Sequence, residues 1–138
     1  MQLHTGRLID HVHLVVRDLD AAKAFYRAVL AVVRPEVEPR EGPEFFNADE
    51  LWVAPGEALS HIHLAFQAPD RETVHRFYQA GLNAGGRDNG APGERSYHPG
   101  YYAAFLYDPD GNIIEAVFHG PAERSAASVV ITAEDPPA

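Results

Sequence analysis

Two short stretches of the chain place histidines in alternation within apolar sequence. DHVHLVV contains His11 and His13, and SHIHLAF contains His61 and His63. Alternate residues of a β-strand share one face of the sheet, so the members of each pair are expected to point the same way. Such imidazoles could hold a metal ion, or they could simply be hydrogen-bonded residues of a core or cleft.

A carboxylate with similar surroundings occurs near the end of the chain. In NIIEAVFH, Glu115 shares a strand face with Ile113 and Val117. A buried carboxylate without a partner is costly, and histidines on facing strands could supply that partner through a bound cation. Two histidines and one carboxylate form a common catalytic site for Fe(II), and they also suit Mn, Ni, Co or Zn. The competing interpretation is a solvent-facing carboxylate on a sheet edge.

The histidine pairs belong to a longer internal repeat. Superposing His11 on His61 also aligns the second histidine of each pair, and after a shift of two residues Phe25-Tyr26 aligns with Phe77-Tyr78. The chain therefore consists of two modules, each of which begins with a strand and continues into a helix.

Periodicity predicts the elements that must position these residues. Apolar stripes at helical spacing predict helices over residues 18–30 and 70–82, with Asp18 or Asp20 capping the first helix and Asp70 the second. Alternation and β-branched residues predict strands at 11–16, 32–39, 44–48, 51–55, 61–66, weakly within 87–97, at 101–107 and at 112–119. The order β-α-β-β-β occurs twice, which predicts an α+β fold.

Composition bounds the remaining possibilities. The 138 residues fit one domain, with module one at about 8–56, module two at about 60–120 and a tail at 121–138 that contains the short strand candidate VVIT. The net charge of -9 disfavours a nucleic-acid partner. The absence of cysteine excludes disulfides and thiolate chemistry. No apolar run could span a membrane and no secretion signal is evident, so a cytoplasmic protein without a membrane partner is expected.

With these motifs the chain resembles the vicinal oxygen chelate superfamily, also called glyoxalase/bleomycin resistance/extradiol dioxygenase, and especially its small glyoxalase-like proteins. The resemblance covers roughly residues 8–120 and rests on IDHVHLVVRDLDAAKAFYRAVL, HIHLAFQAPDRETVHRFYQAGLNAGGRDNGAPG and YHPGYYAAFLYDPDGNIIEAVFH. It implies two βαβββ modules whose mixed sheet curls around a cleft with the helices outside. It also implies a homodimer and one divalent metal ion of unknown identity.

The resemblance implies His11, His61 and Glu115 as metal ligands. The long Gly/Pro-rich loop at 85–100 contributes further candidates, because long loops in compact domains are often functional. His98 is a candidate catalytic residue beside Glu115, and Glu50, His13 and His63 are further candidates for a general base. The substrate-binding candidates are Tyr101, Tyr102, His13, His63, Arg95 and Asn89. Tyr101 and Tyr102 alternate, so one of them is expected in the core.

Two departures from the family patterns matter. The fourth ligand of glyoxalase I falls on Trp52 or Val53, although Glu50 could reach in, and the tyrosine of ring-cleaving dioxygenases falls on Phe105. The expected function is a glyoxalase-like, metal-dependent enzyme that binds a small substrate through two adjacent oxygens, with lyase or isomerase chemistry favoured. The alternatives are an O₂-dependent extradiol-type dioxygenase and a metal-free drug- or metabolite-binding protein.

Overall fold

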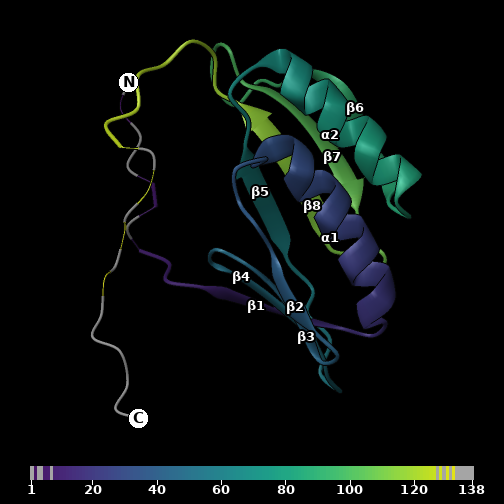
Figure 1. Ribbon diagram of the computed structural model, residues 1–138. Helices are drawn as coiled ribbons and strands as arrows, with labels where there is room; N and C mark the ends of the chain where they lie inside the picture. Colours follow the sequence, from purple (N-terminus) through teal and green to yellow (C-terminus); the bar gives the residue numbers. More distant parts are fainter. Residues whose placement is uncertain are drawn as a thin grey trace.

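The structure is a computed structural model that describes residues 2, 5, 6, 8–126, 128, 130 and 132 (Figure 1). The elements in chain order are β1 (Val12–Val16), α1 (Leu19–Val33), β2 (Arg40–Gly42), β3 (Phe45–Ala48), β4 (Leu51–Pro55), β5 (His63–Gln67), α2 (Arg71–Asn83), β6 (Arg87–Glu94), β7 (Tyr102–Tyr107) and β8 (Ile113–Phe118). The predicted βαβββ order is therefore present twice, and the α+β fold class is confirmed.

The strands form two mixed sheets of four strands each. Their orders are β1-β4-β3-β2 and β5-β8-β7-β6. In each sheet the first strand of the module runs parallel to the last, and the other neighbours are antiparallel. Neither sheet closes into a barrel, so each has one face covered by helices and one face turned away from them. We call these outer surfaces the first open face, on the β1–β4 sheet, and the second open face, on the β5–β8 sheet.

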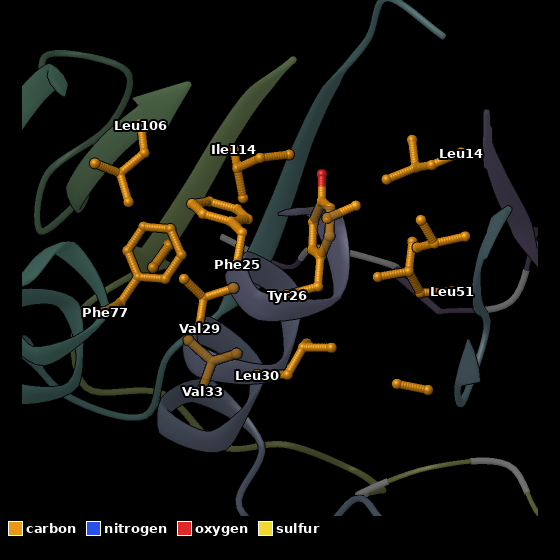
Figure 2. Packing of buried hydrophobic residues seen from close by; sticks show 14 of the residues in the cluster. Leu14, Phe25, Tyr26, Val29, Leu30, Val33, Leu51, Phe77, Leu106 and Ile114 are labelled. Atoms are coloured by element: carbon orange, nitrogen blue, oxygen red, sulfur yellow. The ribbon is translucent and has the colours of Figure 1, made fainter. Parts of the chain in front are cut away.

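Helix α1 connects the two modules through one hydrophobic core. Figure 2 shows that its apolar residues lie between the two sheets. On one side of the helix are Leu14 and Leu51 of the first sheet, near Tyr26; on the other are Phe77, Leu106 and Ile114 of the second module, near Phe25 and Val29. All of these side chains are buried. Helix α1 therefore needs apolar residues around more of its circumference than a helix that covers a single sheet.

Helices α1 and α2 touch at repeat-related positions. Val29 in α1 corresponds to Gly81 in α2 within the repeat, and a Cβ added to Gly81 would lie 3.2 Å from a methyl group of Val29 and 2.2 Å from one of Leu106. Glycine at this position therefore lets the backbone of α2 approach α1 and β7.

Two predicted element boundaries were wrong. Helix α1 continues to Val33, where a strand was predicted, and β2 begins only at Arg40. The cause is that Val33 extends the buried stripe of Val29 and Leu30 by a further turn. The region between Gly85 and Gly100, predicted mainly as a loop, begins with β6, an eight-residue strand whose pairing with β7 shifts register twice. The predicted VVIT strand includes residues outside those described.

Neither helix within the described ranges is long and apolar enough to cross a membrane.

Candidate functional site

Glu115 lies on the second open face and is only 3% exposed. Its position in β8 alternates with Ile114 and Ala116, which point into the core, so its carboxylate points away from the helices. Nε2 of His63 lies 2.8 Å from Oε1 of Glu115, and the hydroxyl of Tyr101 donates to Oε2. The carboxylate therefore has the hydrogen-bond partners that its burial requires.

Tyr101 is held as a proton donor beside this carboxylate. Burial, followed by the hydrogen bond to Glu115, raises the pKa of the Tyr101 phenol well above its usual range. The phenol consequently stays protonated at neutral pH. Tyr101 also makes edge-to-face contacts with the rings of Tyr97, His98 and His119.

His98 and His119 form a stacked pair beside Tyr101. Nδ1 of His98 donates to the carbonyl of Pro99 over 2.8 Å, because a carbonyl can only accept. In neutral His98, Nε2 therefore accepts, and Nδ1 of His119 donates to it over 2.8 Å. This order of donors leaves Nε2 of His119 with a lone pair. Burial and then the neighbouring His98 lower the pKa of His119, which keeps its imidazole neutral.

His119 was not among the site residues predicted from the sequence. The signal available in the sequence is that His119, at the end of NIIEAVFH, falls on the same strand face as Glu115. The loop that carries His98 folds back beside the end of β8, and this long-range contact cannot be read from the periodicity of one strand.

The first open face carries the other histidine pair. A cavity of about 330 Å³ is lined by His11, His13, Asn47 and Trp52. Nδ1 of His11 lies 2.7 Å from a carboxylate oxygen of Asp10. A carboxylate that accepts from Nδ1 leaves Nε2 as the ligating nitrogen, as it does for many metal-bound histidines. His11 and Asp10 are both exposed.

The three expected ligands are not assembled within one copy of the chain. Among the residues that the structure describes, no three side chains of His, Asp or Glu are placed to hold a metal ion together. His11 precedes β1 of the first sheet, whereas Glu115 lies in β8 of the second, and His61 lies exposed just before β5. The donor types fit a divalent cation. Within one copy, however, His11 lies apart from Glu115, and His61 lies four positions before Ala65, the cross-strand partner of Glu115.

The register identifies the position in the first module that corresponds to Glu115. His63 is opposite Ile113, and Glu115 lies two residues further along β8. His13 is opposite Trp52, so the corresponding position in β4 is Ala54 rather than the expected Trp52 or Val53. An alanine cannot ligate a metal, and Glu50 is exposed before β4 begins.

The remaining substrate-binding candidates differ in their burial and in the face of the sheet on which they lie. Tyr102 is buried on the helix side of β7, where its hydroxyl lies 2.5 Å from Nε2 of His75, so it is the core member of the tyrosine pair. The guanidinium of Arg95 lies 5.2 Å from the ring centre of Phe105, which places Arg95 near the second open face because Phe105 is opposite Glu115. Asn89 is half-buried within β6, where the pairing changes register.

Comparisons with known proteins agree with this fold and repeat. The sequence model of the Glyoxalase/Bleomycin resistance protein/Dioxygenase superfamily matches residues 8–116, and the chain therefore belongs to this superfamily. No curated protein matches the chain.

Several solved structures are similar to this chain. A glyoxalase/bleomycin resistance protein from Albidiferax ferrireducens has 28% identity and a TM-score of 0.66, with 80% of this chain and 97% of that chain covered. The fosfomycin resistance protein FosX from Listeria monocytogenes has 22% identity and a TM-score of 0.59, with 83% and 93% covered. Lactoylglutathione lyase from Agrobacterium tumefaciens has 22% identity and a TM-score of 0.58, with 82% and 94% covered. At 22% identity, FosX and the lyase show only that this chain shares their fold.

Proposed function

We propose that the protein is a metal-dependent, glyoxalase-like enzyme whose site is completed by two copies of the chain. His11 of one copy, with His61 and Glu115 of the other, would hold one divalent ion. The observation that carries this proposal is the separation of the expected ligands over two open faces. His11, oriented by Asp10, lies on one face, and the buried Glu115 lies on the other. An isologous dimer that paired unlike open faces would form two equivalent sites.

A divalent ion bound there would act as a Lewis acid on two adjacent oxygens of a small substrate. The residues of the chain would handle the protons. Tyr101 holds a proton beside Glu115 and can donate a hydrogen bond to a substrate oxygen that displaces the carboxylate from it. Nε2 of His119 carries the lone pair that a general base needs, and His98 fixes that tautomer. Lyase or isomerase chemistry is favoured because such reactions need a proton to be moved but no external oxidant.

Metal binding in mixed dimers tests the proposal. Incubation with Fe(II), Mn, Ni, Co or Zn, followed by elemental analysis, is expected to give one ion per chain for at least one of these metals. His11→Ala and Glu115→Gln should each abolish binding. Coexpression of the two variants should restore about a quarter of the wild-type metal content, because about half of the dimers are mixed and each mixed dimer keeps one intact site.

Glu57→Gln, which changes an exposed glutamate just after β4, is the matched control and should bind metal like the wild type. If the wild type bound metal but coexpression of His11→Ala and Glu115→Gln restored none of the metal content, the site would lie within one copy. A strict monomer in sedimentation experiments would contradict the dimer.

A metal-free drug- or metabolite-binding protein is the second candidate function. The observation that favours it is that Glu115 already has two hydrogen-bond partners within the chain, His63 and Tyr101. A full-length protein that stays metal-free after incubation with every ion would support this candidate and exclude the enzyme.

A further inference from the structure

A row of four side chains crosses the first open face from one edge of the sheet to the other. The register pairs His13 with Trp52, Trp52 with Asn47, and Asn47 with Arg40. Directly opposed residues of neighbouring strands share one face of a sheet. An imidazole, an indole, an amide and a guanidinium therefore follow one another along this row, and the first three line the cavity.

The indole of Trp52 is held by an aromatic neighbour. The ring of Phe45 stacks on it with a centroid separation of 4.8 Å and an interplanar angle of 6°. Trp52 is half-buried and lines the cavity, so Phe45 supports the indole while part of the indole remains accessible. A supported aromatic surface of this kind favours a flat, apolar ligand.

The guanidinium of Arg40 is oriented by the side-chain amide of Asn47, which is itself held by two hydrogen bonds. Nδ2 of Asn47 donates to the carbonyls of Asp49 and Leu51, at 3.1 and 3.0 Å. Oδ1 of Asn47 must therefore face the other way, where it accepts from Nε and Nη2 of Arg40, at 3.2 and 2.8 Å.

Arg40 is thus preorganised by a neutral partner. Within the described part of the chain, it makes no ion pair with a carboxylate. Its charge is uncompensated and its remaining N–H groups can bind an anion, a role for which the planar guanidinium is well suited.

We propose that this row binds an aromatic anion, with the ring of the ligand on Trp52 and its anionic group at Arg40. The cavity is at the lower end of the range for small-molecule sites and suits a ligand of one or two rings. The placement of His11 and His13 at the opposite end of the row makes this the substrate site of the proposed enzyme, and to that extent the inference rests on the proposed function. The preference for aromatic anions depends only on Trp52 and Arg40.

Three small probes separate the aromatic from the anionic contribution. Benzoate is both aromatic and anionic, benzamide is aromatic and neutral, and cyclohexanecarboxylate is anionic without an aromatic ring. Trp52 is the only tryptophan of the chain, so its indole N–H gives a single NMR signal that reports binding. Benzoate is expected to shift this signal saturably and to bind about tenfold more tightly than either of the other probes.

Two substitutions test the roles of the residues. Arg40→Gln should weaken benzoate binding about tenfold and leave benzamide unchanged, whereas Arg40→Lys should restore part of the difference. Trp52→Leu, followed by ligand-detected NMR, should remove the preference for benzoate over cyclohexanecarboxylate. Arg34→Gln removes the same charge from an arginine that is paired with Glu36 after α1, and it should change nothing.

The titrations are repeated with a metal chelator and in the Glu115→Gln variant. An unchanged selectivity there would keep the inference valid even if the protein bound no metal. The inference would be overturned if the wild type bound benzoate and benzamide equally tightly. It would also be overturned if the Arg40→Gln variant still bound benzoate more tightly than benzamide. Neither result would bear on the proposed metal site.

Discussion

On the second open face, neighbouring side chains determine the protonation states of Tyr101 and His119. Glu115 is a buried acceptor with donors on both oxygens, and Tyr101 is one of these donors. A short distance away, burial and then the neighbouring His98 disfavour the charged form of His119. The result is a protonated phenol and a neutral imidazole side by side, which is the pairing that proton transfer near neutral pH requires.

The titration of His119 can be measured directly. Its pKa is expected below the usual value of about 6.5, because burial first and then His98 disfavour the imidazolium, although Glu115 opposes this shift. His98→Asn should raise the pKa of His119 in an NMR titration of the ring protons. Since the unfolded chain binds this proton first as the pH falls, the free energy of unfolding should decrease below pH 6.5, and less so in His98→Asn. A pKa of His119 at or above 6.5 would contradict the stacked arrangement.

Individual residues were predicted unevenly from the sequence. Periodicity identified Glu115 as a carboxylate that needs a partner, because one strand suffices to show which residues share its face. It could not show that His63, rather than His61, would reach Glu115. That outcome depends on where β5 begins and on the cross-strand register that sets His63 two positions from the partner of Glu115. The expected ligand set of His11, His61 and Glu115 stays a prediction.

At the scale of elements, the two helices begin in the same way. Oδ1 of Asp18 accepts from the backbone N–H of Ala21 over 3.1 Å in α1. Oδ1 of Asp70 accepts from both the backbone N–H and the hydroxyl of Thr73, over 2.7 and 2.6 Å, in α2. These caps satisfy backbone donors that the first turn of a helix leaves free.

Removing the two caps should have unequal effects. Asp70→Ala is expected to lower the free energy of unfolding by about 1–2 kcal/mol and Asp18→Ala by about 1 kcal/mol or less, measured by urea denaturation at neutral pH. The hydroxyl and then the N–H of Thr73 lower the pKa of Asp70, so its contribution is present above the unfolded pKa of 3.8 and is lost as the pH falls through the folded pKa. The cost of Asp70→Ala should therefore shrink in acid. If Asp70→Ala lowered the free energy of unfolding equally at neutral pH and in acid, this account would be contradicted.

Elements with strong periodicity were predicted well, and the exceptions have physical causes. The alternation in LWVAP and in NIIEAVFH predicted β4 and β8 closely, because both strands have one face in the core. The end of α1 was misplaced because Val32 and Val33 favour strand by their branching, whereas packing of Val33 into the core keeps them helical. Strand β6 was obscured by its glycines and proline, and its irregular pairing with β7 explains why they are tolerated.

At the scale of the whole molecule, one buried polar cluster joins the modules. The hydroxyl of Tyr26, in α1, donates to Oδ2 of Asp108 over 2.5 Å, and Asp108 is 1% exposed in the turn between β7 and β8. Asn112 donates to both oxygens of Asp108 and accepts from the backbone N–H of Ile62. The helix of module one is thereby attached to the last turn of module two.

The repeat supplies a matched control for this contact. Tyr26→Phe is expected to lower the free energy of unfolding by about 1.5–3 kcal/mol, because a buried carboxylate loses a donor. Tyr78→Phe, at the repeat-related position, removes a more exposed hydrogen bond to Asp88 and should lower the free energy of unfolding clearly less than Tyr26→Phe does. Urea denaturation measures both, and equal costs would contradict a special role for the cluster.

The effect of Tyr26→Phe on stability should also depend on pH in the alkaline range. Burial, and then the charge of Asp108, raise the pKa of Tyr26 well above 10.0. Folding therefore favours the protonated phenol, and this stabilisation is complete below pH 10 and is lost as the pH rises towards the folded pKa. The stability difference between wild type and Tyr26→Phe should consequently narrow above pH 10.

The contact between Val29 and Gly81 means that the two halves of the repeat are no longer interchangeable. Equivalent positions of an internal duplication have become opposite sides of one interface, with a branched side chain in one half and no side chain in the other. A chain built from two first modules would set valine against valine there, and a chain built from two second modules would leave a void. The ancestral symmetry therefore survives in the order of strands and helices, whereas the packing between the halves allows only one arrangement of them.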